Sequence, residues 1–515
     1  MDISKIVVDS NGVTTWLVDG KPFIALAGEL HNSSTSNAHY MEERVWPALR
    51  PLGLNTVLAP VAWETIEPIE GAFDFTLVDQ LVEQARREGL RLALLWFGLW
   101  KNGESWYTPE WVKRDTVRFF RARLQGGLIS DTVSPFCEAG INADAPAFAR
   151  LMAHVKEIDE QYRTVIMVQV ENEVGILGAE RDFCEAANCK FSHTVPDELA
   201  QLIPTVSPVS YKSAWSEAFG EDAPELFMAW HYASALERIA AAGKAEYPLP
   251  MYANAWLRQF PERPGIFPSG GPTATVLTVW QIAAPSLDAL APDIYVTDFE
   301  KACADYGASG YPLLIPEARR DPVCASNAIF AIGRGALLFS PFAIDAVVQS
   351  NEAASGGVLP SIPDDKGYDC QNTALYLRAA YRLLSQAMPM LVEYGSNLTV
   401  FHKASQHQLG TILPMEDCDL VITYLDDEPG KPGTSGIVFE RDTNDFIIVG
   451  CRFTVKPLAK RNSGKRVSII TFEEGSLDGI EWRAGRVLNG DERNTPRIGD
   501  IPGAIRLKVL MEAIV

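Results

Sequence analysis

The chain has few basic residues for its acidic content. Its 45 lysines and arginines are outnumbered by 66 aspartates and glutamates, which leaves a formal net charge of -21. Because like charges repel, this excess opposes binding to nucleic acid or to an anionic membrane surface. The composition therefore excludes these two partners and favours a neutral or cationic ligand.

Long apolar runs and metal-binding patterns are also missing. The longest apolar candidate, 93–100, is much shorter than the roughly 20 residues that cross a bilayer, and the start, MDISKIVVDS, lacks the basic head and apolar core of a signal peptide. The 8 cysteines are dispersed, which favours free thiols, and no second Cys or His pair is spaced to form a zinc site with Cys184 and Cys189. We expect a cytoplasmic protein without a metal or cofactor.

What the chain does contain is a large apolar fraction, 47% of 515 residues, arranged in three patterns. Residues 1–22 read as a hairpin with turns at Asn11-Gly12 and Asp19-Gly20. Residues 23–394 alternate strands with amphipathic helices such as 77–88, 145–162 and 225–242. Residues 395–515 show short alternating strands and predict an all-β sandwich domain.

The alternating region holds eight candidate strands, which predicts an α/β fold, a closed (β/α)8 TIM barrel. The strands are expected at 23–27, 55–59, 91–96, 164–170, 249–253, 287–296, 312–315 and 335–339. An open doubly wound sheet is the alternative. It would require a glycine-rich phosphate turn after the first strand, and 27–31 is not one.

Two glutamates stand where the active site of such a barrel lies, at the carboxyl ends of strands. Glu173 follows the fourth strand and Glu317 the seventh, and these strands face each other across the barrel mouth. One carboxyl could protonate a glycosidic oxygen while the other attacks the anomeric carbon, and Arg319 or Arg320 could keep Glu317 charged. By alternation Glu171 points to the same side as Glu173, and we interpret it as a supporting group bound to a neighbouring strand.

Further polar and aromatic residues follow the strands and are candidates for sugar binding. Aromatic rings can stack on the C–H faces of sugars, and amides or charged groups can bind hydroxyls. His31 and Glu64 are equally compatible with structural roles. The candidates are Glu29, His31, Asn32, Trp63, Glu64, Trp100, Lys101, Asn102, Asn172, Asn254, Trp256, Tyr295 and Phe342.

The stretch MVQVENEVG, residues 167–175, resembles the fourth-strand motif of clan A retaining glycoside hydrolases, and VQVENE-x-G resembles family 35, the β-galactosidase family. VAWETIEPIEGAFDF, residues 61–75, is similar to a second segment of that family. The pattern is closer to a bacterial branch with a β-rich C-terminal domain. The resemblance implies that Glu173 is the acid/base, Glu317 the nucleophile and Asn172 a partner of the sugar 2-hydroxyl.

Two segments depart from the family pattern, GELHNSS after the first strand and LWFGLWKNGES at the third. We expect a retaining exo-β-glycosidase, a β-galactosidase acting on terminal sugars of oligosaccharides or other glycosides. The altered third segment keeps a β-glucosidase or a β-glucosyltransferase open as alternatives. A non-catalytic carbohydrate-binding protein is the alternative from another class, and a homodimer is compatible with a β-rich appendage.

Overall fold

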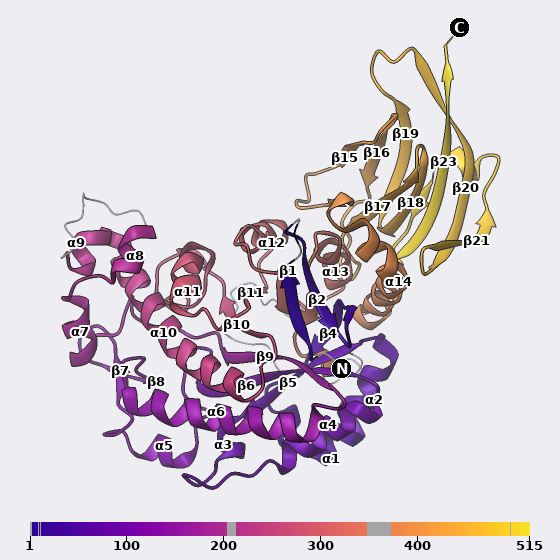
Figure 1. Cartoon of the computed structure of the whole chain (residues 1–515). Helices are drawn as coiled ribbons and strands as arrows, with labels where there is room; N and C mark the ends of the chain where they lie inside the picture. The colour runs from indigo at the N-terminus through magenta and orange to yellow at the C-terminus, as the bar shows by residue number, and fades with distance from the viewer. Residues whose placement is uncertain are drawn as a thin grey trace.

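Eight parallel strands close into a barrel in the computed structural model, which describes residues 3–8, 10, 12–202, 213–347, 372–494 and 496–514 (Figure 1). The order around the barrel is β10-β11-β12-β13-β4-β5-β6-β9, and every neighbouring pair is parallel. The predicted barrel and all eight strands are confirmed. Their bounds are β4 (Ala25–Glu29), β5 (Thr56–Ala62), β6 (Arg91–Lys101), β9 (Val165–Asn172), β10 (Met251–Trp256), β11 (Ala289–Ile294), β12 (Leu314–Ala318) and β13 (Leu338–Pro341).

Amphipathic helices cover the outside of the barrel, so the strands are buried on both faces and read as nearly continuous apolar runs. The predicted helices at 77–88, 145–162 and 225–242 are confirmed as α4 (Thr76–Arg87), α6 (Glu138–Asp159) and α10 (Ala223–Glu246). The other main helices are α11 (Leu277–Ala283), α12 (Phe299–Gly307), α13 (Val323–Gly333) and α14 (Thr373–Tyr394). Shorter elements are α1 (Ala38–Tyr40), α2 (Trp46–Leu49), α3 (Trp63–Ile66), α5 (Glu110–Arg114), α7 (Glu185–Phe191), α8 (Asp197–Leu202), α9 (Trp215–Phe219), β7 (Arg121–Arg123) and β8 (Ile129–Val133).

None of the helices in the described ranges combines the length and apolarity that a bilayer span needs. Seven cysteines lie in the described ranges, six buried and one, Cys189, exposed, and no disulfide joins two of them, which fits the expectation of dispersed thiols. Cys370 lies outside the described residues.

The N-terminal segment closes the amino end of the barrel. It forms a three-stranded antiparallel sheet of β1 (Lys5–Val8), β2 (Thr14–Val18) and β3 (Lys21–Pro22), one strand more than the predicted hairpin. Trp16 and Val18 pack in one cluster with residues at the beginnings of barrel strands, among them Ala25 and Leu338. Since the floor is filled in this way, a ligand can enter only at the other end, where the strands finish.

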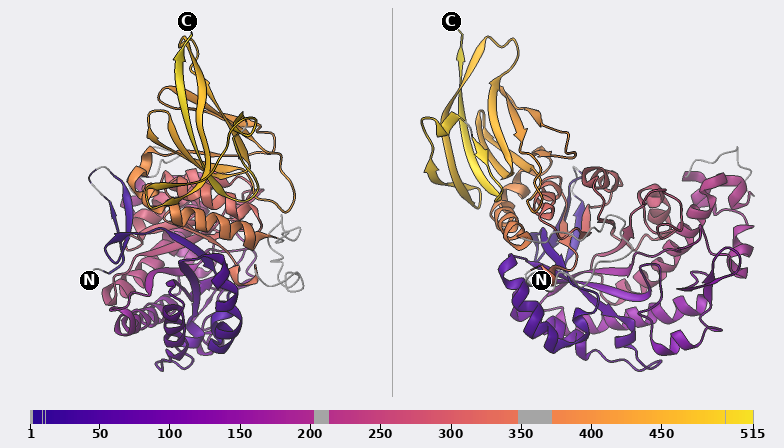
Figure 2. Two further views of the ribbon diagram at one scale, coloured as in Figure 1. Left: turned by 90° about the vertical axis from the view of Figure 1, so that its right-hand side faces the viewer. Right: turned by 180° about the vertical axis from the view of Figure 1, so that it is seen from behind.

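The C-terminal region is the predicted β-sandwich (Figure 2). A six-stranded sheet of order β14-β17-β18-β23-β20-β21 faces a four-stranded sheet of order β15-β16-β19-β22, and all pairs are antiparallel. The bounds are β14 (Thr399–His402), β15 (Gly410–Pro414), β16 (Cys418–Tyr424), β17 (Ser435–Asp442), β18 (Asp445–Cys451), β19 (Phe453–Ala459), β20 (Lys465–Asp478), β21 (Glu481–Val487), β22 (Arg497–Ile498) and β23 (Gly503–Ala513).

The larger sheet is buried on both faces at β17 and β18. Val438 and Ile448 point into the core between the two sheets, whereas Ile437, Ile447 and Val449 join the large core that surrounds the barrel. The alternation of side chains along a strand produces this division. The sandwich therefore rests on the barrel through α13 and α14, which Figure 1 shows beneath it.

Candidate active site

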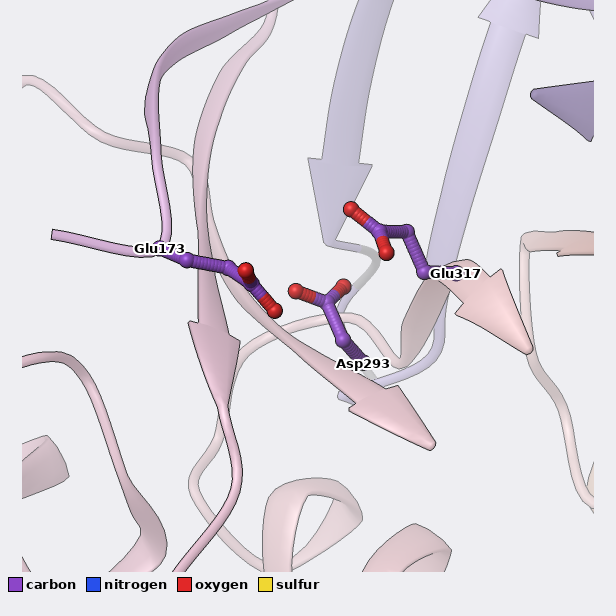
Figure 3. Close-up of side chains that lie close together, drawn as sticks. All are labelled: Glu173, Asp293 and Glu317. Atoms are coloured by element: carbon purple, nitrogen blue, oxygen red, sulfur yellow. The ribbon is translucent and has the colours of Figure 1, made fainter. Parts of the chain in front are cut away.

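Three carboxyl groups meet at the carboxyl ends of the barrel strands. Glu173 follows β9, Asp293 lies near the end of β11 and Glu317 lies in β12, and all three are buried. One oxygen from each lies within 4.8 Å of the others. Figure 3 shows the side chains pointing toward one another, with Asp293 between the two glutamates. The structure thus brings the predicted pair together and adds a third acid.

Glu173 is held in a left-handed backbone conformation, with φ 46°, that turns it toward the barrel axis as the strand ends. Its backbone N–H donates to Asn254 Oδ1 (2.9 Å), and its Oε2 accepts from Asn102 Nδ2 (2.7 Å). Burial and the charge of Glu317 raise the pKa of Glu173 to about 8. A carboxyl with such a pKa is protonated at neutral pH and can serve as a general acid.

Hydrogen-bond donors and a positive charge stabilise the ionised form of Glu317. Tyr295 OH donates to its Oε2 (2.7 Å) and Asn254 Nδ2 approaches its Oε1 (3.5 Å). Burial raises the pKa of Glu317, while the charge of Lys101 and the hydrogen bond from Tyr295 lower it. The positive charge therefore comes from Lys101 of β6. Arg319, proposed from the sequence for this role, forms an ion pair with Asp321 (2.6 Å).

The sequence reasoning missed Asp293. Asn254 Nδ2 donates to its Oδ2 (2.8 Å), and the Asp293 carboxyl is hydrogen-bonded to that of Glu173. Burial and the neighbouring Glu317 and Glu173 raise the pKa of Asp293 well above its ordinary value, so the trio shares protons rather than carrying three charges. A signal existed, because Asp293 is the sole charged residue in 289–296, two positions before Tyr295.

Asn172 and Asn254 form an amide network beside the carboxyls. Asn172 Oδ1 accepts from Gln169 Nε2 (2.9 Å) and from Asn254 Nδ2 (3.2 Å). These bonds fix the orientation of the Asn172 amide and leave its buried Nδ2 without a hydrogen-bond partner among the described residues. The expected role of Asn172 as a partner of the sugar 2-hydroxyl requires such a donor and stays a prediction.

Glu171 supports the site from the other side of β9. β6 bulges here, since Trp96 pairs with Val170 but Lys101 pairs with Asn172. Glu171 accepts from the bulged backbone N–H groups of residues 99 (3.1 Å) and 100 (2.7 Å). The expected bond to a neighbouring strand is confirmed. The expected shared side with Glu173 is wrong, because Glu171 has φ 62°, which breaks the alternation, and its carboxyl meets Asp144 of α6.

Two predicted sugar platforms lie in the core instead. Trp63 and Trp100 are fully buried. The indole N–H of Trp63 donates to Glu67 Oε2 (2.8 Å), and that of Trp100 donates to the carbonyl of Val133 (2.9 Å). Neither ring has a face left for a ligand. Both follow a strand in sequence, but the short helix α3 and the β6 bulge turn them outward into the packing against helices.

Some predicted residues line the rim without joining the carboxyl cluster. His31 Nδ1 contacts Asp345 Oδ1 (2.9 Å), and its ring meets the edge of Phe342 at 5.9 Å. This arrangement fits the structural role considered for His31. Trp256, at the end of β10, is half-buried.

Asn32 and Glu64 line a separate cavity of about 80 Å³ between β5 and α4. This volume is too small for a pyranose ring, since ligand pockets are typically about 300–1,000 Å³. Glu64 also forms an ion pair with Lys113 (2.7 Å). The ion pair gives Glu64 a structural role, whereas the buried Oδ1 of Asn32 has no hydrogen-bond partner among the described residues, and a role in sugar binding stays a prediction for Asn32.

Glu29, at the end of β4, and Lys101, at the end of β6, belong to the site. Glu29 is fully buried and interacts electrostatically with Glu317, Lys101 and Glu173. Burial, and to a smaller extent the charge of Glu317, raises the pKa of Glu29 well above its ordinary value.

The carboxyl cluster also has the composition of a metal site. A hard cation such as Mg²⁺ or Ca²⁺ prefers carboxylate oxygens, and among the described residues Glu173, Asp293 and Glu317 are the group spaced to hold one.

Two carboxyls at the ends of the fourth and seventh barrel strands, hydrogen-bonded by Asn and Tyr, form the arrangement expected of a glycoside hydrolase. Residues 15–223 match the model of Glycosyl hydrolases family 35, which confirms the family resemblance found in the sequence. Residues 377–497 match a domain of unknown function, DUF5597. The second match begins within α14 and covers most of the sandwich.

Individual proteins match this chain over a short stretch or at low sequence identity. A β-galactosidase of Xanthomonas manihotis is 39% identical over 84 residues, which is 16% of this chain and 14% of that protein. The crystal structure of a β-galactosidase from Bacillus circulans sp. alkalophilus has a TM-score of 0.45 at 15% identity, covering 62% of this chain and 50% of that one. For the exo-β-1,4-mannosidase Op5Man5 from Opitutaceae bacterium strain TAV5 the TM-score is 0.40 at 14% identity, with 65% and 54% covered. This chain thus spans one seventh of the curated relative and about half of these solved structures.

Proposed function

We propose that this protein is a retaining exo-β-glycosidase that releases terminal β-linked galactose from oligosaccharides or other glycosides. The observation that carries the proposal is the pair Glu173 and Glu317, whose carboxyl oxygens approach within 4.8 Å. Retaining glycosidases place their two carboxyls about 5–5.5 Å apart, whereas inverting enzymes leave about 6.5–9.5 Å for a water molecule. The spacing supports a covalent mechanism.

In the first step Glu317 attacks the anomeric carbon and forms a covalent bond to it. The bond to the leaving oxygen breaks, and Glu173 gives its proton to that oxygen. The hydrogen bond from Tyr295 and the charge of Lys101 stabilise the ionised form of Glu317 before attack. The different surroundings of the two glutamates therefore assign the nucleophile and the acid.

In the second step the glycosyl-enzyme is hydrolysed. Esterification removes the negative charge of Glu317, which had raised the pKa of Glu173. Glu173 can then act as a base, take a proton from water and direct the hydroxide to the anomeric carbon. The sugar leaves with its original β configuration, and both carboxyls return to their starting protonation states.

Galactose as the released sugar is supported by the match of residues 15–223 to family 35. The third-strand segment LWFGLWKNGES departs from the family pattern, which keeps open a second candidate on the same machinery, a β-glucosidase or β-glucosyltransferase. Galactose and glucose differ in the configuration of the C4 hydroxyl, and a transferase differs from a hydrolase in the acceptor of the second step. Both require the same nucleophile.

Trapping of the intermediate tests the proposal. The protein is incubated with activated 2-deoxy-2-fluoro β-galactoside and β-glucoside, and the modified peptide is mapped by mass spectrometry. We expect one fluorosugar on Glu317, release of β-configured product from the natural sugar, and no trapping in Glu317→Gln. An inverted product, or labelling of another residue, would refute the retaining assignment. Sugar binding without turnover on a broad panel of glycosides would instead support the non-catalytic alternative.

A further inference from the structure

The four residues of the proposed chemistry occupy one arc of the barrel. Glu173, Asn254, Asp293 and Glu317 come from β9, β10, β11 and β12, which are consecutive in the barrel order. The opposite arc consists of β13, β4, β5 and β6. It presents two buried titratable side chains at the same end, Glu29 and Lys101.

Neither of these two side chains has a hydrogen-bonded partner in the described part of the chain. Both carboxyl oxygens of Glu29 are buried without a partner. Lys101 contacts the ring of Phe97, its ammonium nitrogen 4.8 Å from the ring centroid, but makes no ion pair or side-chain hydrogen bond among the described residues. Burying a charged group without hydrogen bonds is costly, so a fold retains such groups where a ligand satisfies them.

Lys101 also shows where that ligand lies. Its charge acts on Glu29, Glu173 and Glu317, which come from three different strands, yet it bonds to none of them. Glu29 and Lys101 thus stand across the barrel mouth from Glu173 and Glu317, at the end of the barrel where the proposed mechanism places the sugar ring.

We propose that Glu29 and Lys101 select the terminal sugar by binding its hydroxyls at C4 and C3. This inference rests on the proposed function, which places C1 beside Glu317. C4 lies opposite C1 in a pyranose ring, so the hydroxyls at C4 and C3 face the arc of β4 and β6. Glu29 accepts hydrogen bonds from them, and Lys101 donates to one of their oxygens.

The groups around the site also indicate the substrate class. Burial raises the pKa of Glu29, Glu173 and Asp293 and favours their neutral forms, while the charge of Lys101 acts on Glu317. The site therefore offers hydrogen bonds with little net charge, which suits a neutral terminal pyranose with free hydroxyls at C3 and C4.

The test is a set of double-mutant cycles between the protein and its substrate. The kcat/KM of the wild type, Glu29→Gln and Lys101→Met is measured on the preferred chromogenic β-glycoside and on its 3-deoxy, 4-deoxy and 6-deoxy analogues. We expect the wild type to lose at least 100-fold in kcat/KM on removal of the 4-hydroxyl, and Glu29→Gln to lose less than tenfold from the same deletion. Loss of the 6-hydroxyl should cost all three proteins the same factor.

Thermal melting separates binding from a structural role. Because the Glu29 oxygens accept no hydrogen bond from the described residues, Glu29→Gln should melt at or above the wild-type temperature. Glu171→Gln, which loses an acceptor of a backbone N–H, should melt lower. Equal sensitivity of the wild type and both variants to every deoxy substitution would overturn this inference alone. A wild type that releases sugar from no glycoside would overturn the proposed function and this inference with it.

Discussion

The proposed role of Glu173 as general acid predicts an upper pH limit on activity. As general acid Glu173 must carry its proton before the leaving group departs, so the active form exists below the pKa of about 8 and is lost as the pH rises through it. Each further pH unit should lower kcat/KM tenfold, which gives a roughly 100-fold loss at pH 10. The profile of kcat/KM reports the free enzyme, which is the state described by the structure.

The assay compares a disaccharide with a nitrophenyl glycoside from pH 5 to 10. The alkoxide leaving group of the disaccharide needs the proton, whereas nitrophenolate leaves almost unaided. Glu173→Gln should lower kcat/KM on the disaccharide by about 10²–10⁴ and remove the alkaline limb, with a much smaller loss on the nitrophenyl glycoside. An alkaline limb with its midpoint below pH 6, or no limb at all in the wild type, would refute the assignment of Glu173 and the account of its raised pKa.

Three other changes give distinct outcomes. Tyr295→Phe removes the hydrogen bond that lowers the pKa of Glu317, so the acid limb of kcat/KM should move to higher pH; an unmoved limb would contradict this. Lys101→Met should move it the same way, and Lys113→Met, whose partner Glu64 lies outside the cluster, is the matched control. Gly98→Ala should lower the free energy of unfolding by several kcal/mol in denaturant titrations. The added Cβ would lie 2.4 Å from Glu171 Oε1 and 2.5 Å from Asp144 Oδ2, closer than atoms can approach. A variant as stable as the wild type would show that these carboxyls do not pack against Gly98.

Periodicity alone was enough to predict the barrel. The barrel strands are buried on both faces and are apolar throughout, whereas the helices are buried on one face and are amphipathic. This alternating pattern located all eight strands. The motif around Glu173 added the position of the acid. Glu317 followed from strand order, because the seventh strand of a closed barrel has a fixed place relative to the fourth.

Residues at strand ends were less predictable, because backbone conformation there is set by tertiary contacts. The left-handed φ of Glu171 and the bulge of β6 turn side chains away from the faces that alternation assigns. Trp100 therefore joins the core, although its neighbour in β6, Lys101, lies among the carboxyls of the site. Asp293 was missed because a single acid in an apolar strand has meaning only beside its partners from other strands.

The sheet made by β17 and β18 has no free face, since one side completes the sandwich and the other completes the packing around α13 and α14. A truncation before β14 would leave apolar helix surface exposed to water, and the excised module would carry the matching exposed surface. The sandwich is thus part of the same continuous core that supports the barrel.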